Sequence, residues 1–164
     1  MKYTTILLVA LLFGACTTTE PAKKSEPGIN PSAPETSSIA PALERDVLHY
    51  INLHRESKGL TPFIFNAVVA TEARKHSTNM ASRRVPFGHQ GMNTRMKSIT
   101  SKMKTVNLVS ENVARGPLTA QQVVNMWLKS PGHKKNIEGK YKYTGIGVAR
   151  DRKSDLYFTQ IFAD

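Results

Sequence analysis

Three side chains in this sequence have the chemistry of a polar functional site: His89, Glu111 and His133. Imidazole and carboxylate groups can transfer protons or bind a metal ion. Their spacing is not diagnostic by itself, because two histidines and a glutamate about twenty residues apart occur by chance in many domains. The sequence contains no HExxH, GxSxG or CxxC pattern that would point to a known catalytic or metal-binding arrangement.

His133 follows the run Ser-Pro-Gly at 130–132, which is typical of the start of a helix. The partial positive charge of a helix N-terminus disfavours a protonated imidazole, and Lys134 and Lys135 act in the same direction. We therefore expect His133 to be neutral near pH 7, with a nitrogen lone pair available. Ser130 is expected to cap this helix, and its hydroxyl is also a candidate to line a cleft.

A fourth candidate, His76, lies on the apolar face of an expected helix at 67–82, together with Val69, Ala73 and Met80. This position favours a buried, hydrogen-bonded structural histidine over a ligand.

The N-terminus has the pattern of an export signal. Lys2 precedes an apolar run at 6–13, which is too short to span a bilayer as a helix, and residues 1–15 are therefore expected to be a signal peptide. Cys16, the only cysteine, stands where a signal peptidase would cut. We expect it to be acylated, as in a bacterial lipoprotein, although Phe13 stands where leucine is usual. An ordinary signal peptide with an incidental cysteine is the alternative.

Residues 16–41 are rich in Pro, Ser and Thr and are expected to be a flexible linker behind the lipid-anchored Cys16. Residues 42–164 are expected to form one domain. The formal net charge of the chain is +11, which favours anionic partners such as an envelope lipid or polymer. We expect no nucleic-acid partner for a lipid-anchored exported protein, and we expect a monomer.

The remaining patterns predict helices first and strands last. The expected helices begin near Leu43, 67, 94, 119 and 130, and the expected strands, 143–150 and 156–163, form an antiparallel hairpin around a polar turn. This order argues for the α+β class. Trp127, Phe162 and Met80 are expected in the core.

Several motifs together resemble a bacterial SCP domain of the CAP superfamily, named for cysteine-rich secretory proteins, antigen 5 and pathogenesis-related proteins. They are HSTNM at 76–80, FGH at 87–89, SENVARG at 110–116, MWLKSPGHKKNI at 126–137, YTGIGVA at 143–149 and YFTQIF at 157–162. The resemblance covers about residues 43–163.

The resemblance implies a three-layer α-β-α sandwich in which a small antiparallel sheet lies between helices. It also implies a ligand cleft formed by His89, Glu111, Ser130 and His133. In the eukaryotic branch an acid stands three residues after the tryptophan, whereas this chain has Ser130 there. His89, His133 and Glu111 would then be the ligands of a divalent cation, zinc or magnesium, which would bind more weakly than with two carboxylates.

Two functions from different classes follow. The first is a non-catalytic binding module, displayed at the outer membrane or cell surface, for a lipid, a sterol or another envelope ligand. The alternative is a metal-assisted hydrolase of peptide or cell-wall bonds, in which Glu111 or His133 would be the general base. No serine or cysteine nucleophile with a convincing partner is apparent, so binding is favoured. A third, weaker hypothesis is an effector that perturbs membranes through its cationic face.

Overall fold

The computed structural model describes residues 36–164, with side chains from residue 39 onward. The chain divides into two units, 1–33 and 34–164. The second unit contains its own hydrophobic cores and hydrogen-bonded sheet, as expected of a segment that folds alone. The expected signal peptide, Cys16 and the linker up to residue 35 lie outside the described residues.

The described unit has five helices and four strands, which confirms the α+β class. The helices are α1 (Thr36–Ser57), α2 (Ala67–Ala81), α3 (Met92–Lys102), α4 (Ala120–Lys129) and α5 (Pro131–Ile137). The strands are β1 (Ile64–Phe65), β2 (Val109–Gly116), β3 (Tyr143–Arg150) and β4 (Leu156–Ala163).

Local sequence signals account for two of the helix starts. Asn66 caps α2, because its side chain accepts hydrogen bonds from the backbone N–H groups of Val68 and Val69. Thr119 and Gln122 form a capping box at the start of α4. The start of α1 differs from the expectation: the helix begins at Thr36, so the last part of the segment expected to be linker is helical. Ala40 packs against the larger core, which explains why this turn is ordered with the domain.

The sheet has the strand order β1-β3-β4-β2. The predicted hairpin is present as the antiparallel pair of β3 and β4, and β2 pairs antiparallel with the other side of β4. Every residue of β4 is buried, as expected for a central strand covered on both faces. β1 is a two-residue parallel addition beside Tyr143 and Thr144, so β3 beyond this point is an edge strand.

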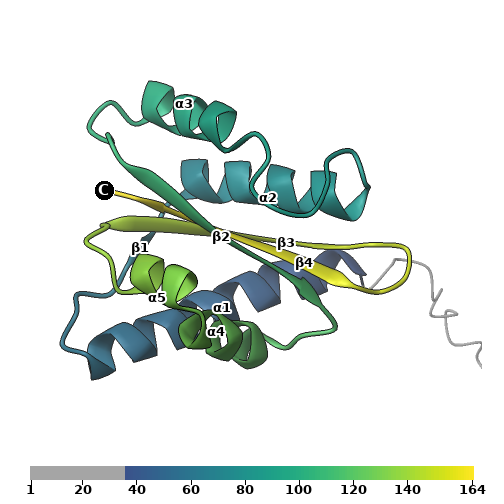
Figure 1. Ribbon diagram of the computed structural model, residues 1–164, viewed down its shortest axis with the longest axis horizontal. Coiled ribbons are helices and arrows are strands. Elements are labelled where there is room, and N and C mark those ends of the chain that lie inside the picture. Colours follow the sequence, from purple (N-terminus) through teal and green to yellow (C-terminus); the bar gives the residue numbers. More distant parts are fainter. Residues whose placement is uncertain (1–35) are drawn as a thin grey trace, which may run out of the picture. The chain divides into compact units, whose positions relative to one another are not determined.

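Helices cover both faces of the sheet, which confirms the α-β-α sandwich (Figure 1). On one face, α1, α4 and α5 bury a core that includes Ile51, Trp127 and Phe162. On the opposite face, α2 and α3 bury a smaller core that includes Val69 and Ile99. The predicted core positions Trp127, Phe162 and Met80 are all buried.

Gly145 and Gly147 allow α2 to lie directly on β3. A Cβ atom at Gly145 would overlap the backbone of Ala70, and one at Gly147 would overlap the backbone of Arg74. Two small residues on one face of β3 therefore set the height of α2 above the sheet.

Side chains protect both edges of the sheet. The Glu44 carboxylate accepts a hydrogen bond from the backbone N–H of Val148 (3.2 Å) on β3, and Arg74 of α2 binds the same carboxylate. On the outer edge of β2, the Trp127 indole N–H donates to the carbonyl of Val113 (3.1 Å). Edge groups paired in this way do not recruit a foreign strand.

Within residues 36–164, no helix combines the length and the apolar character needed to cross a membrane.

Candidate functional site

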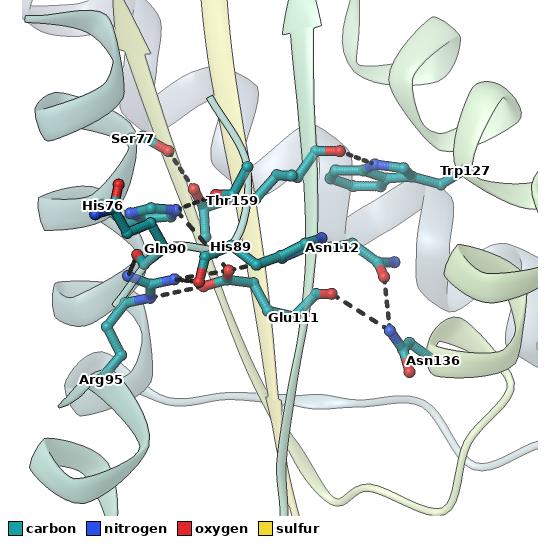
Figure 2. A network of polar contacts seen from close by, with 12 residues as sticks. His76, Ser77, His89, Gln90, Arg95, Glu111, Asn112, Trp127, Asn136 and Thr159 are labelled. Atoms are coloured by element: carbon teal, nitrogen blue, oxygen red, sulfur yellow. Dashed lines mark hydrogen bonds and ion pairs between the residues drawn. The ribbon is translucent and has the colours of Figure 1, made fainter. Parts of the chain in front are cut away.

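Glu111 lies at the centre of a buried polar network, on the face of β2 that is covered by α2 and α3. Its side chain is only 1% exposed. Successive residues of a strand point to opposite faces, so the next residue, Asn112, points toward α4 and α5. The two neighbours therefore connect β2 to different helical layers (Figure 2).

Arg95 of α3 provides the main partner of Glu111. Its Nε donates to one carboxylate oxygen of Glu111 (2.7 Å), and its Nη2 donates to the other (2.8 Å). This bidentate, charge-assisted arrangement is the strongest geometry for such a pair. The Nη1 group of Arg95 donates to the carbonyl of Gln90 (2.9 Å), which ties the loop before α3 to the same guanidinium.

His89 is the partner of Glu111 on the solvent side. The Nδ1 of His89 lies 3.0 Å from a carboxylate oxygen of Glu111, and a carboxylate can only accept, so Nδ1 carries the hydrogen in this contact. In the neutral ring, the lone pair is then on Nε2. The His89 side chain is 51% exposed, and the site thus presents one oriented imidazole at the surface.

His76 lies behind this pair and is buried, as predicted. Its Nε2 donates to the carbonyl of Gly88 (2.7 Å) and is 3.9 Å from Glu111. Burial lowers the pKa of His76, which the Gly88 hydrogen bond opposes only in part, and the nearby Arg95 charge lowers it further. His76 therefore anchors the loop that carries His89.

His133 flanks the network on the other side of β2. Its backbone carbonyl accepts from the Asn112 amide (3.2 Å), and the Asn136 amide donates to Asn112 Oδ1 (2.9 Å). The pKa of His133 is lowered, first by burial and second by the charge of His89. This direction of the His133 pKa agrees with the prediction, and its causes here are burial and the charge of His89.

Ser130 is the residue before α5, but its side chain makes no capping hydrogen bond. Its backbone carbonyl accepts from the N–H of Lys134 (2.9 Å) in the first turn. The expectation that the hydroxyl caps this helix is therefore wrong.

The residues present do not fit the divalent cation that the resemblance implies. Within residues 36–164, no three His, Cys, Asp or Glu side chains are grouped so that they could hold a metal ion. Both oxygens of Glu111 are already engaged by Arg95 and His89, and the guanidinium places a fixed positive charge where a cation would have to bind. The guanidinium of Arg95 thus neutralises Glu111 in place of a metal ion.

Sequence reasoning missed Arg95, which has more contacts with Glu111 than either histidine. Nothing in the spacing singled it out, because it lies in a segment of scattered basic residues. Its role is apparent only in the structure, where a buried carboxylate requires a cationic partner and Arg95 is buried beside it.

The predicted ligand cleft is matched only in part by the described contacts. His89 and Glu111 are in direct contact, and His133 is close enough for the charge of His89 to affect it. Four hollows in the described part of the chain are lined by other residues. The surface around His89 and His133 can accept a hydrogen bond from a ligand at each unprotonated ring nitrogen.

Known proteins share this architecture. Similar solved structures include an extracellular protein with an SCP domain from Bacillus anthracis str. Ames, with a TM-score of 0.67, 23% identity and coverage of 82% of this chain and 44% of that chain. They also include an outer surface protein from Borrelia burgdorferi, with a TM-score of 0.65, 21% identity and coverage of 73% of this chain and 90% of that chain.

The sequence is also 31% identical over 145 residues to the uncharacterized protein YkwD of Bacillus subtilis (strain 168), a match that covers 85% of this chain and 53% of that protein. The chain thus spans about half the length of this relative. The model of the CAP family, described as the cysteine-rich secretory protein family, matches residues 48–162. Because this match includes the sheet, its helical layers and the network around Glu111, the chain belongs to the CAP family.

Proposed function

We propose that this chain is an exported, lipid-anchored CAP domain that binds a lipid of the cell envelope and catalyses no reaction. Export is supported by the signal-like sequence before Cys16 and by the similarity to an outer surface protein and an extracellular protein. The lipid anchor is a proposal from the sequence around Cys16.

The observation that carries the choice of binding over catalysis is the burial of Glu111 and its pairing with Arg95. A general base needs a free lone pair within reach of the proton that it removes. Glu111 is buried, and its two oxygens accept three hydrogen bonds from Arg95 and His89. The position where a second acid stands in the eukaryotic branch is Ser130, so the site offers no free carboxylate there.

An apolar groove along α1 supports a lipid as the ligand class. It has a volume of about 550 Å³, within the range of small-molecule sites. Pro41, Leu48 and Phe65 provide its apolar wall, and Arg45 is an exposed cation at its rim. A single acyl chain with an anionic head matches this combination, and we take a long-chain fatty acid as the simplest case.

Titration of residues 34–164 with a fluorescent fatty acid tests the proposal. Two half-exposed phenylalanines provide a matched pair: Phe65 lines the groove, whereas Phe87 stands two residues before His89. We expect Phe65→Ala to weaken binding at least fivefold and Phe87→Ala to leave it unchanged. Weakening by Phe87→Ala and His89→Ala alone would instead assign the ligand to the cleft predicted from the sequence. No saturable binding by the unmodified domain would refute the lipid proposal.

One observation favours the hydrolase alternative. Glu111 fixes the ring of His89 so that Nε2 points away from the carboxylate, which is the arrangement that orients a histidine general base. A water molecule would then be the nucleophile. Turnover of casein or peptidoglycan by the purified domain, abolished by His89→Gln in a protein that still folds, would overturn the preference for binding.

The anchor is tested separately by cell fractionation. The Cys16→Ser protein should leave the membrane fraction, because no acyl chain holds it there once the signal-like run has been removed. If the Cys16→Ser protein stays in the membrane fraction to the same extent, acylation at this residue is refuted.

A further inference from the structure

We propose that the end of the domain where α1 begins is a docking surface for the anionic headgroups of phospholipids. This inference rests on the membrane attachment proposed above and adds an orientation to it. The surface is formed by five exposed cations, which we call the arginine-rich end: Arg83, Arg84, Arg150, Arg152 and Lys153.

The cations of the arginine-rich end have no ion-pair partner within residues 36–164. Several other arginines of the domain do: Arg74 binds Glu44, Arg95 binds Glu111 and Arg115 binds Asp155. Unpaired positive charges gathered in one place repel one another, so their proximity is unfavourable unless a negative partner is present.

Two segments that are far apart in the sequence bring these cations together. A hollow of about 590 Å³ separates the end of α2, with Thr78 and Arg83, from the β3–β4 turn, with Arg150 and Arg152. A second hollow of about 510 Å³ shares Thr78 and includes Arg84. Four of the five cations line the first hollow and Arg84 lines the second, so the arginine-rich end borders two neighbouring hollows, which gives room for more than one phosphate group.

The backbone of this surface is held in an unusual conformation. Arg83 has a φ of 59°, in the left-handed region where glycine or asparagine would be less costly. Its N–H donates to the carbonyl of Met80 (3.0 Å), which fixes the turn. The N–H of Arg84 donates to the carbonyl of Asn79 (2.9 Å), so the left-handed Arg83 belongs to the hydrogen-bonded end of α2, which places Arg83 and Arg84 together at this end.

One acid, Asp151, lines the same hollow as these cations, so the five cations and this one carboxylate together carry a net charge of +4. Asp151 Oδ1 accepts from the backbone N–H groups of Lys153 and Asp155, so this carboxylate shapes the β3–β4 turn. Its Oδ2 is buried without a hydrogen-bond partner. Asp155 is paired with Arg115.

The position of the arginine-rich end on the chain identifies the membrane as the partner. Glu44 of α1 contacts Val148 near the end of β3 and Arg74 in the middle of α2, and α1 begins about two turns before Glu44. Figure 1 shows the start of α1, the end of α2 and the β3–β4 turn at the same end. The chain continues from Thr36 toward Cys16, which is at most about 70 Å away along an extended backbone. An anchored domain therefore has this end tied to the bilayer.

Vesicle co-sedimentation of residues 34–164, which carry no acyl chain, tests the surface independently of the anchor. The test variant replaces Arg83, Arg84, Arg152 and Lys153 with Gln. The control variant removes the same number of charges elsewhere, at Lys97, Lys104, Lys135 and Lys140, which are exposed and make no ion pair in the described residues.

We expect the unmodified domain to bind vesicles of phosphatidylcholine with one quarter phosphatidylglycerol and not to bind phosphatidylcholine alone. The test variant should bind at least roughly tenfold more weakly, because each cation near an anionic surface contributes to binding. The control variant should bind within about twofold of the unmodified domain. Equal losses in both variants, or binding to neutral vesicles, would overturn the proposal. A test variant that loses affinity for soluble polyphosphate but keeps its affinity for anionic vesicles would also overturn it. If the Cys16→Ser protein stays in the membrane fraction, the anchor is refuted, but the vesicle result is unaffected.

Discussion

At the residue scale, the site depends on the buried pair of Glu111 and Arg95. Replacing Glu111 with Gln keeps the shape but removes the charge, so the buried guanidinium loses its counterion. Breaking one side of a buried pair costs about 3 kcal/mol or more. We expect Glu111→Gln to lower the free energy of unfolding by about 3 kcal/mol in urea denaturation. Glu56→Gln, at an exposed position of α1, should change it by less than about 0.5 kcal/mol. Equal stabilities of the two variants would show that the network is not structural.

The same pair determines how the site responds to metal ions. A zinc ion would have to displace Arg95 from Glu111 before it could bind His89 and the carboxylate together. We therefore expect calorimetric titration of residues 34–164 with zinc to give the same heat for the unmodified domain and for His89→Ala/His133→Ala. A saturable heat that disappears in the double variant would restore the metal site expected from the family resemblance.

The buried histidines make stability depend on pH. The pKa values of His76 and His133 are lowered in the folded protein, mainly by burial. Below the unfolded value of about 6.5, the unfolded chain therefore binds more protons than the folded chain. Stability should be complete above pH 6.5 and fall as the pH decreases through the folded values.

Urea unfolding at pH 7.5 and 5.5 measures this effect above the range in which most carboxylates titrate. The unmodified domain should be less stable at pH 5.5. His76→Gln should reduce the difference between the two pH values, whereas His49→Gln, at an exposed position, should leave it intact. If His76→Gln retains the full difference, burial of this ring does not explain the pH dependence.

At the scale of elements, the contact between α2 and β3 depends on the absence of two side chains. Gly145→Ala would place a methyl group against the backbone of Ala70, which cannot move without shifting the helix. We expect a loss of about 3 kcal/mol, at the upper end for overpacking. The matched change Gly132→Ala, in the first turn of α5, meets no atom within 4 Å and should be neutral or slightly stabilising. Thermal unfolding of the two variants compares them, and similar melting temperatures would contradict the close packing.

Elements with their own local signal were predictable from the sequence, and elements defined by tertiary contacts were not. The caps at Asn66 and Thr119 and the β3–β4 hairpin are local, because each depends on residues a few positions apart. β2 was missed because its run VSENVARG carries polar residues on both faces, which hides the period of a strand. Those polar residues are explained only by partners from α3 and α5.

The residues of the candidate site show the same difference between local sequence signals and tertiary contacts. His89 and Glu111 were predicted together, because family motifs mark them. Arg95 was not predicted, since its role comes from the packing of α3 over β2. Sequence motifs therefore identify the groups that face a ligand, and the structure is needed to find the group that neutralises them.

At the scale of the whole molecule, the clustering of positive charge has opposite effects on membrane binding and on the stability of the isolated domain. The chain has a net charge of +11, and the arginine-rich end gathers unpaired cations in one region. If this arrangement serves membrane binding, it should cost stability in the isolated domain, because like charges repel. Functional surfaces commonly carry such a cost.

The variant with Gln at Arg83, Arg84, Arg152 and Lys153 should therefore be more stable than the unmodified domain, by up to about 1 kcal/mol at 100 mM NaCl. The Debye length is then about 10 Å, so cations in one cluster still repel while distant cations are screened. The control variant at Lys97, Lys104, Lys135 and Lys140, whose charges are divided between two regions of the domain, should gain less.

At 1 M NaCl the Debye length falls to about 3 Å and the advantage should disappear. Urea unfolding at the two salt concentrations measures both effects. If the variant with four Gln substitutions is less stable than the unmodified domain at 100 mM NaCl, these cations stabilise the fold. The argument that their clustering costs stability and is retained for membrane binding would then be wrong.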